Sequence, residues 1–277
     1  MKKVICIVLF MLGMATTSYA GVYMNVPIDI AVNGRYIKSD VRPFLISGTT
    51  YVPIRFVSEA LRADEVVWDG QNDTAVVRKG DTEIIMPVGK NYALINGQSI
   101  QIPNGVRLVG DRTFVPVRFV SECFGAGVSW DGEHLNVLIE KPDISVNPGS
   151  VYDRGYSNEN IYWLGRIIDA EAEGEPMNGK IGVGDVVLNR VKSDLYPDTV
   201  YEVIFDTKFG VQFEPVINGR IYQTPSFDSL VAAKYCLQGE NIVGESLFFL
   251  NPVTAASSWI TTDRQHYTTV GNHHFYL

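Results

Sequence analysis

Residues 167–176 read Ile-Ile-Asp-Ala-Glu-Ala-Glu-Gly-Glu-Pro, an apolar run that ends in three glutamates, a glycine and a proline. Spacings of i, i+3 and i+4 predict one helical face made of Ile161, Leu164, Ile167, Ile168 and Glu171. Gly174 and Pro176 then end the helix. The sequence therefore predicts a buried helix that carries the Glu171 carboxyl on its apolar face, in its last turn.

The Glu171 carboxyl is the candidate catalytic group. Burial disfavours the charged form of a carboxyl and raises its pKa, and the negative end of the helix dipole acts in the same direction. Such a carboxyl can donate a proton near neutral pH. Glu175 lies one turn later on the same face, whereas Glu173 is rotated by about 200° from Glu171 and should meet solvent. The alternative is a solvated helix end, where glutamates are common.

Six short motifs, beginning with this stretch, follow one another along the chain at residues 171–176, 186–191, 212–216, 247–252, 259–260 and 270–275. In this order they make the segment from Asn158 to the C-terminus resemble the cell wall hydrolase domain of the SleB/CwlJ spore cortex-lytic family. Two departures stand out: Glu214 replaces a small residue, and residues 261–269 are only loosely similar. They concern the substrate contacts rather than the reaction class.

The resemblance implies a small, mainly helical, lysozyme-like domain that cleaves the MurNAc–GlcNAc glycosidic bond of peptidoglycan without a metal or cofactor. It implies that Glu171 is catalytic, and that the substrate is bound by Glu175, Phe213, Asn251 and Trp259. A place in the core is the alternative for the last three. A conventional glycosidase needs a second carboxylate about 5 to 10 Å away, and none stands out in the sequence. A lytic transglycosylase needs only one glutamate, so we expect that class.

The N-terminal half contains an internal repeat. Residues 50–59, Thr-Tyr-Val-Pro-Ile-Arg-Phe-Val-Ser-Glu, recur as residues 113–122, Thr-Phe-Val-Pro-Val-Arg-Phe-Val-Ser-Glu, at an offset of 63. Each unit has Asn-Gly and Asp-Gly hairpin signals and a short helical pattern after its proline. Residues 25–141 resemble the copper amine oxidase N-terminal-like repeat of secreted bacterial wall proteins. We expect two units that pair into one compact α+β domain.

The histidine content argues against copper in this domain, because His134 is its single histidine and copper requires a cluster of nitrogen or sulfur ligands. Equivalent positions of the two units hold Arg55 and Arg118, and Trp68 and Trp130. These residues are candidates for a wall-binding face, since aromatic rings suit the faces of sugars. For the tryptophans, a place in the core is the alternative.

The first 20 residues have the pattern of a secretory signal peptide, with two lysines, an apolar run at 4–14 and the cleavage site Ser18-Tyr19-Ala20. The apolar run is too short to span a bilayer, so we expect no transmembrane segment in the mature protein. Losing Lys2 and Lys3 changes the net charge from −8 to −10. Nucleic acid is therefore not an expected partner. We expect a secreted protein that binds peptidoglycan glycan strands of the cell wall or spore cortex.

Two other functions stay open. A zinc-dependent N-acetylmuramoyl-L-alanine amidase would use His266, His273 and His274, although adjacent histidines on an extended segment point to opposite faces and cannot both reach one metal. A non-catalytic wall-binding protein would be favoured by a Glu171 that is exposed and outside any pocket. Cys123 and Cys236 lie in apolar helical patterns, where we expect free thiols.

The predicted architecture is α+β with two domains. A signal peptide at 1–20 precedes the duplicated domain at 21–141, a linker at 142–160 that lacks periodicity, and the cell wall hydrolase domain at 161–277. Within the last domain we expect further helices over 179–191 and 229–237. Extended segments are expected at 247–250 and 267–276.

Overall fold

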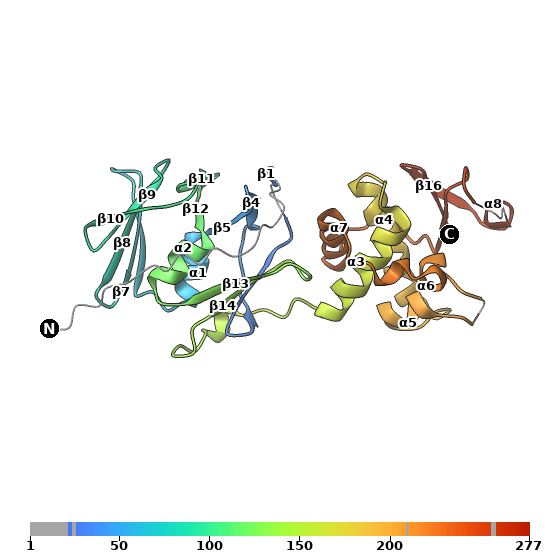
Figure 1. Cartoon of the computed structure of the whole chain (residues 1–277), viewed down its shortest axis with the longest axis horizontal. Coiled ribbons are helices and arrows are strands. Elements are labelled where there is room, and N and C mark those ends of the chain that lie inside the picture. The colour runs from blue at the N-terminus through green and yellow to red at the C-terminus, as the bar shows by residue number, and fades with distance from the viewer. Residues whose placement is uncertain (1–21, 24–25, 209, 256–258) are drawn as a thin grey trace.

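The structure, a computed structural model of the 277-residue chain, describes residues 22–23, 26–208, 210–255 and 259–277. The predicted signal peptide lies outside these residues. A sheet-rich N-terminal part and a helical C-terminal part lie next to each other along the long axis (Figure 1). The protein is therefore mixed α+β. Within the described ranges, no helix is long and apolar enough to cross a membrane.

The N-terminal part repeats one order of elements. After β1 (Val22–Tyr23), the first unit contains β2 (Asp29–Val32), β3 (Arg35–Tyr36), β4 (Phe44–Ile46), β5 (Thr49–Pro53), α1 (Ile54–Ala60), β6 (Glu65–Asp69) and β7 (Thr74–Lys79). After β8 (Thr82–Pro87), the second contains β9 (Tyr92–Ile95), β10 (Gln98–Gln101), β11 (Arg107–Val109), β12 (Arg112–Pro116), α2 (Val117–Cys123), β13 (Gly127–Asp131) and β14 (Asn136–Glu140). Each helix starts directly after a proline, which cannot extend the strand ladder further.

The two units meet through β5 and β12, which pair antiparallel with Val52 opposite Val115. Tyr51 lies opposite Pro116, and Pro53 opposite Phe114, so the register is unchanged when the units are exchanged at the 63-residue offset. This is the pairing expected of units related by an approximate two-fold axis. The symmetry ends at β14, which pairs in parallel with β2 and joins the last strand of the domain to its first unit.

The C-terminal part is built on α3 (Asn158–Ala172), α4 (Met177–Val191) and α7 (Phe227–Leu237), which pack against one another. Around them lie α5 (Val200–Phe205), α6 (Glu214–Asn218), α8 (Trp259–Asp263) and the antiparallel strands β15 (Phe248–Leu250), β17 (His273–Tyr276) and β16 (His266–Val270). The short 3₁₀ helices are η1 (Pro148–Ser150) and η2 (Arg220–Tyr222). The two helices predicted after α3 occur as α4 and α7, whereas α5, α6 and α8 were not predicted.

Glycines allow the three main helices to approach closely. A Cβ at Gly165 on α3 would lie 2.8 Å from Leu230 on α7, and one at Gly184 on α4 would lie 2.7 Å from the Cys236 sulfur. Cys236 is buried, its thiol donates to the Ile181 carbonyl, and it forms no disulfide with Cys123. Gly165 and Gly184 therefore serve helix packing.

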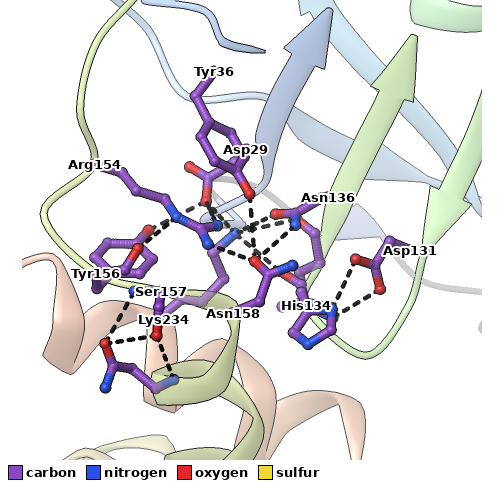
Figure 2. Close-up of polar contacts among 12 residues, drawn as sticks. Asp29, Tyr36, Asp131, His134, Asn136, Arg154, Tyr156, Ser157, Asn158 and Lys234 are labelled. Carbon is purple, nitrogen blue, oxygen red and sulfur yellow. Dashed lines mark hydrogen bonds and ion pairs between the residues drawn. The ribbon is translucent and has the colours of Figure 1, made fainter. Parts of the chain in front are cut away.

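The two parts share a buried polar junction centred on Asp29 of β2 (Figure 2). Its carboxylate lies 2.7 Å from the Lys234 ammonium of α7 and 3.3 Å from the Arg154 guanidinium. The hydroxyls of Tyr152 and Tyr156 donate to the same carboxylate. Because Lys234 has no exposed area and Asp29 only 3 %, this ion pair is shielded from water.

The segment 142–160, predicted as a linker, thus supplies three of the residues that hold this junction. α3 begins inside it, at Asn158, and Ser157 caps the helix by accepting from the Asn160 backbone N–H. Apolar residues of α3 and α7, among them Ile161 and Leu230, belong to the same core cluster as the N-terminal sheets. The exact domain boundaries stay a prediction.

Candidate active site

Glu171 lies in the last turn of α3, where the sequence predicts it. Ile161, Leu164, Ile167 and Ile168 have no exposed surface, and they fix the apolar face of α3 in the core. The helix ends at Ala172, and α4 starts after Pro176. Glu171 itself is only partly buried and lies at the rim of this core.

Three charged groups surround the Glu171 carboxyl. Burial raises its pKa to about 7, and the negative charge of Glu214 acts in the same direction. The positive charges of Arg220 and Arg190 act against this shift without cancelling it. A carboxyl with this pKa is partly protonated at neutral pH and can either donate or accept a proton.

Arg190 is a buried cation in the wall of the site. It is the next-to-last residue of α4, its Nε donates to the Leu247 carbonyl at 2.9 Å, and its guanidinium lies 5.2 Å from the Phe213 ring and 5.8 Å from the Phe248 ring. Sequence reasoning noted Arg190 in the motif at 186–191 but gave it no role. The available signal was an arginine in the last turn of a core helix.

Glu214 and Arg220 reach the site through α6 and η2, which the sequence did not predict. Glu214 is the first residue of α6, and Arg220 follows the left-handed Gly219 that ends this helix. Arg220 also forms an ion pair of 3.0 Å with Glu173, whose side chain is 70 % exposed. The expected solvent exposure of Glu173 is thus what the structure shows. Glu214, noted from sequence as a departure from the family pattern, lies close enough to influence Glu171.

Glu175 bonds to the turn between β16 and β17. Its carboxylate accepts from the backbone N–H of Asn272 at 3.0 Å and from the side-chain amide of Asn272 at 2.8 Å. These bonds hold the pKa of Glu175 below its usual value despite partial burial. A Cβ at Gly271 would lie 2.0 Å from this carboxylate, so the contact depends on glycine. Glu175 therefore ties the end of α3 to the small sheet, and its predicted contact with substrate stays a prediction.

The other three predicted substrate residues differ in exposure. Phe213 is 3 % exposed and packs against Phe249, which is the core placement that the sequence left open. Asn251 follows β15, and its side chain accepts from the Val253 backbone N–H. Trp259 is 47 % exposed and lies edge-on to Phe248 at 5.8 Å. Of the three, Trp259 is the most exposed, whereas Phe213 lies in the core next to the Arg190 guanidinium.

Comparison with known proteins assigns each part of the chain to a family. Residues 174–276 match the family described as cell wall hydrolase. The C-terminal domain belongs to the cell wall hydrolase family. Residues 31–139 match the copper amine oxidase N-terminal domain, which accounts for the repeated part. Glu171 lies three residues before the matched hydrolase segment.

Individual relatives are similar to this chain over about half of its length. The spore cortex-lytic enzyme of Bacillus cereus is 36 % identical over 129 residues, 47 % of this chain and 48 % of the relative. That of Oceanobacillus iheyensis is 35 % identical over 133 residues, 48 % and 47 % of the two chains. The chain therefore spans about half the length of these relatives. A solved structure, the catalytic domain of the germination-specific lytic transglycosylase SleB from Bacillus anthracis, is 36 % identical, with 46 % and 100 % coverage and a TM-score of 0.42.

The histidines of the cell wall hydrolase domain separate onto two faces of its small sheet. His273 is 6 % exposed and lies edge-on to Phe249, whereas His274 lies 5.5 Å from His266 on the other face. The predicted opposition of His273 and His274 is confirmed. Within the described part of the chain, no group of three His, Cys, Asp or Glu side chains is placed to hold a metal ion.

The candidate wall-binding residues of the repeated domain are exposed at equivalent places. Trp68 on β6 is 44 % exposed and Trp130 on β13 is 42 % exposed, so neither ring is in the core. Each indole nitrogen lies over the glycine two residues later in its hairpin. Arg55 and Arg118 are also exposed, and each forms an i,i+4 ion pair on its helix. Each unit thus exposes one tryptophan and one arginine at equivalent positions.

Proposed function

We propose that the cell wall hydrolase domain cleaves the MurNAc–GlcNAc glycosidic bond of peptidoglycan as a lytic transglycosylase, with Glu171 as the acid and then the base. The observation that supports this role is the Glu171 pKa of about 7, set by burial and by Glu214. The related spore cortex-lytic enzymes and the Bacillus anthracis lytic transglycosylase support the reaction class.

The proposed reaction needs one proton and returns it. Protonated Glu171 gives its proton to the glycosidic oxygen while the bond from that oxygen to C1 of the muramic acid breaks. The C6 hydroxyl of the same sugar then attacks C1, and the Glu171 carboxylate takes the hydroxyl proton. Arg190 and Arg220 favour the carboxylate between these steps because both are positively charged. No water is consumed, and the product ends in 1,6-anhydromuramic acid.

Mass spectrometry of the muropeptides released from purified wall tests this reaction. We expect 1,6-anhydromuramic acid ends, which are lighter than reducing ends by one water. Cleavage between muramic acid and the first amino acid would instead establish the amidase alternative. That alternative also predicts loss of lysis in chelator and recovery with zinc, whereas we expect lysis to survive chelation. Absence of any cleavage would favour a non-catalytic wall-binding protein.

A hydrolase is the second candidate, and the position of Glu214 favours it. A retaining or inverting glycosidase uses two carboxylates, and Glu214 is near enough to Glu171 to raise its pKa. In this case Glu214 would activate a water or attack the sugar itself. Reducing ends in the same muropeptide spectra, together with loss of lysis in Glu214→Gln, would support the hydrolase over the transglycosylase.

We also propose that the protein is secreted through residues 1–20 and acts on the cell wall or the spore cortex. The repeated domain would bind glycan strands through Trp68 and Trp130, whose exposed rings can stack on sugar faces. Co-sedimentation with purified wall tests this role. We expect the double change Trp68→Ala and Trp130→Ala to release the protein from wall while Glu171→Gln stays bound.

A further inference from the structure

A pocket lies between the repeated domain and the cell wall hydrolase domain, away from Glu171. It has a volume of about 280 Å³ and is lined by Gly132, Glu133, Arg166, Thr224, Pro225, Phe227 and Leu230. Arg166 precedes Glu171 by five residues on α3, which turns its side chain by about 140° from the catalytic face. The pocket is therefore a separate site.

The guanidinium of Arg166 is buried with its donors largely unused. The residue is 6 % exposed, yet its Nε has no hydrogen-bond partner within the described ranges. One terminal nitrogen donates to the Tyr162 carbonyl at 3.4 Å, and the other lies 4.0 Å from the Glu133 carboxylate. A buried charge of this kind normally satisfies its five N–H groups, because an unpaired buried cation is costly.

Stacking fixes the direction in which these donors point. The guanidinium carbon lies 3.5 Å from the centroid of the Tyr162 ring, so one face of the planar group is covered. The N–H groups lie in the guanidinium plane, so they point outward from its edge and not toward the Tyr162 ring. A planar fork held in this way matches the two oxygens of a carboxylate.

The remaining walls indicate the kind of carboxylate. Pro225, Phe227 and Leu230 make one side apolar, and Thr224 adds a hydroxyl. Glu133 is 61 % exposed, so it can swing away from Arg166 at little cost. An apolar wall beside one cation suits an organic acid with a small alkyl group better than an inorganic anion. The volume suits a ligand of one or two amino acids.

We propose that this pocket binds the terminal carboxylate of a peptide stem of the wall polymer. The inference rests on the proposed function, because peptidoglycan carries such peptides on the glycan that Glu171 would cleave. Arg166 pairs with the carboxylate in a bidentate manner, and the apolar wall receives the side chain of the last residue. Glu133 competes for the same guanidinium when the pocket is empty.

A matched pair of ligands tests the site on the full chain. The probes are diacetyl-Lys-D-Ala-D-Ala and the same tripeptide with a C-terminal amide, followed by calorimetry and by the Nε–H NMR signal of Arg166. We expect the acid to bind about ten- to a hundredfold more tightly than the amide, and to shift that signal. Equal affinity for acid and amide, or no binding of either up to tens of millimolar, would overturn the proposal.

Two variants distinguish the roles of the ligand carboxylate and of the Glu133 carboxylate, which compete for Arg166. Glu133→Gln should tighten binding of the acid severalfold, because it removes the competitor, and should leave the amide unchanged. Arg166→Met should reduce binding of the acid to the level of the amide, and the exposed Arg35→Met serves as its control. Unchanged acid affinity in Arg166→Met would overturn the proposal. If Arg166→Met does not fold, the affinities of Glu133→Gln for the acid and the amide test the site instead. Unchanged affinity of Glu133→Gln for the acid would then overturn the proposal.

Two further binding measurements show which part of the proposal fails if one does. Inorganic phosphate that binds as tightly as the acid would overturn the peptide assignment and leave a general anion site. Binding is also measured on Glu171→Gln, where we expect the wild-type affinity. Peptide binding without glycan cleavage would reject the proposed function alone, and glycan cleavage without peptide binding would reject this inference alone.

Discussion

Two carboxyls that the fold desolvates, Asp29 and Glu171, meet opposite kinds of neighbour. Asp29 at the junction lies between Lys234 and Arg154 and accepts from two tyrosine hydroxyls. Glu171 in the candidate active site has a like-charged neighbour, Glu214, and no ion-pair partner within 4 Å in the described part of the chain. Burial alone therefore does not decide the chemistry of a carboxyl, since the partners that meet it in the fold decide whether it stabilises the structure or exchanges protons.

The comparison extends to the cations. Lys234 is buried at the junction, where desolvation lowers its pKa to about 8, so it still carries its charge at neutral pH opposite Asp29. It also donates to the backbone carbonyls of His134 and Leu135. Arg166, which is 6 % exposed, has one carbonyl acceptor, that of Tyr162 at 3.4 Å, among the described residues. Fully paired charges mark the structural cluster, whereas underused charges mark sites open to a ligand.

The largest expected effect is the loss of activity in Glu171→Gln. Glutamine is nearly isosteric with glutamate but cannot donate the proton to the leaving oxygen, so lysis should fall by several orders of magnitude. Turbidity loss of purified wall measures it, with circular dichroism as the check on folding. Glu173→Gln is the matched control, because its side chain points to solvent, and it should retain nearly full activity. Substantial lysis by folded Glu171→Gln would remove this residue from the mechanism.

The junction should respond with a loss of stability. Asp29→Asn leaves Lys234 and Arg154 buried without their counter-charge and should cost about 3–5 kcal/mol in the free energy of unfolding. Denaturant unfolding measures this change. Adding Lys234→Met to the Asp29→Asn chain should recover part of the loss. A change below about 1 kcal/mol in Asp29→Asn would mean that the junction contributes little to folding.

Replacing the carboxyl by an amide at Glu171 should instead increase the free energy of unfolding. Because the pKa of Glu171 is about 7 in the folded protein and 4.5 ordinarily, the folded state holds more protons between these values, and stability falls as pH rises through this window. Glu171→Gln removes this cost and should gain about 1–2 kcal/mol at pH 8, with no gain at pH 4. Unfolding curves at the two pH values measure it. Equal stabilities of wild type and variant at pH 8 would contradict the raised pKa.

The smallest expected effect is a shift in the pH profile of Glu214→Gln. Activity requires protonated Glu171 and should decline as pH rises through about 7. Without the negative charge of Glu214, the pKa of Glu171 falls, so the alkaline limb should move to lower pH by less than about one unit. Rates of wall lysis across pH measure this shift. An unmoved limb would place Glu214 too far from Glu171 to matter.

Local sequence patterns predicted α3, its end and the direction of Glu171, because helical periodicity and a Gly/Pro stop depend on neighbouring residues only. The internal repeat likewise indicated the order of strands and helices in both units. Short elements such as α6 escaped prediction, since five residues carry too little periodicity to be recognised. Because α6 was not predicted, the position of Glu214 near Glu171 was not predicted either.

The sequence by itself determined the two kinds of domain, the repeated unit and the helix that presents Glu171, because these follow from local spacing and from motif order. Only the tertiary structure decided which charges meet. Asp29 and Lys234 are 205 residues apart, and Glu171 and Glu214 are 43 apart. Neither pair can be read from local spacing. Their pairing depends on how α3, α6, α7 and β2 pack, and packing fixes the partners of each buried charge and therefore its pKa.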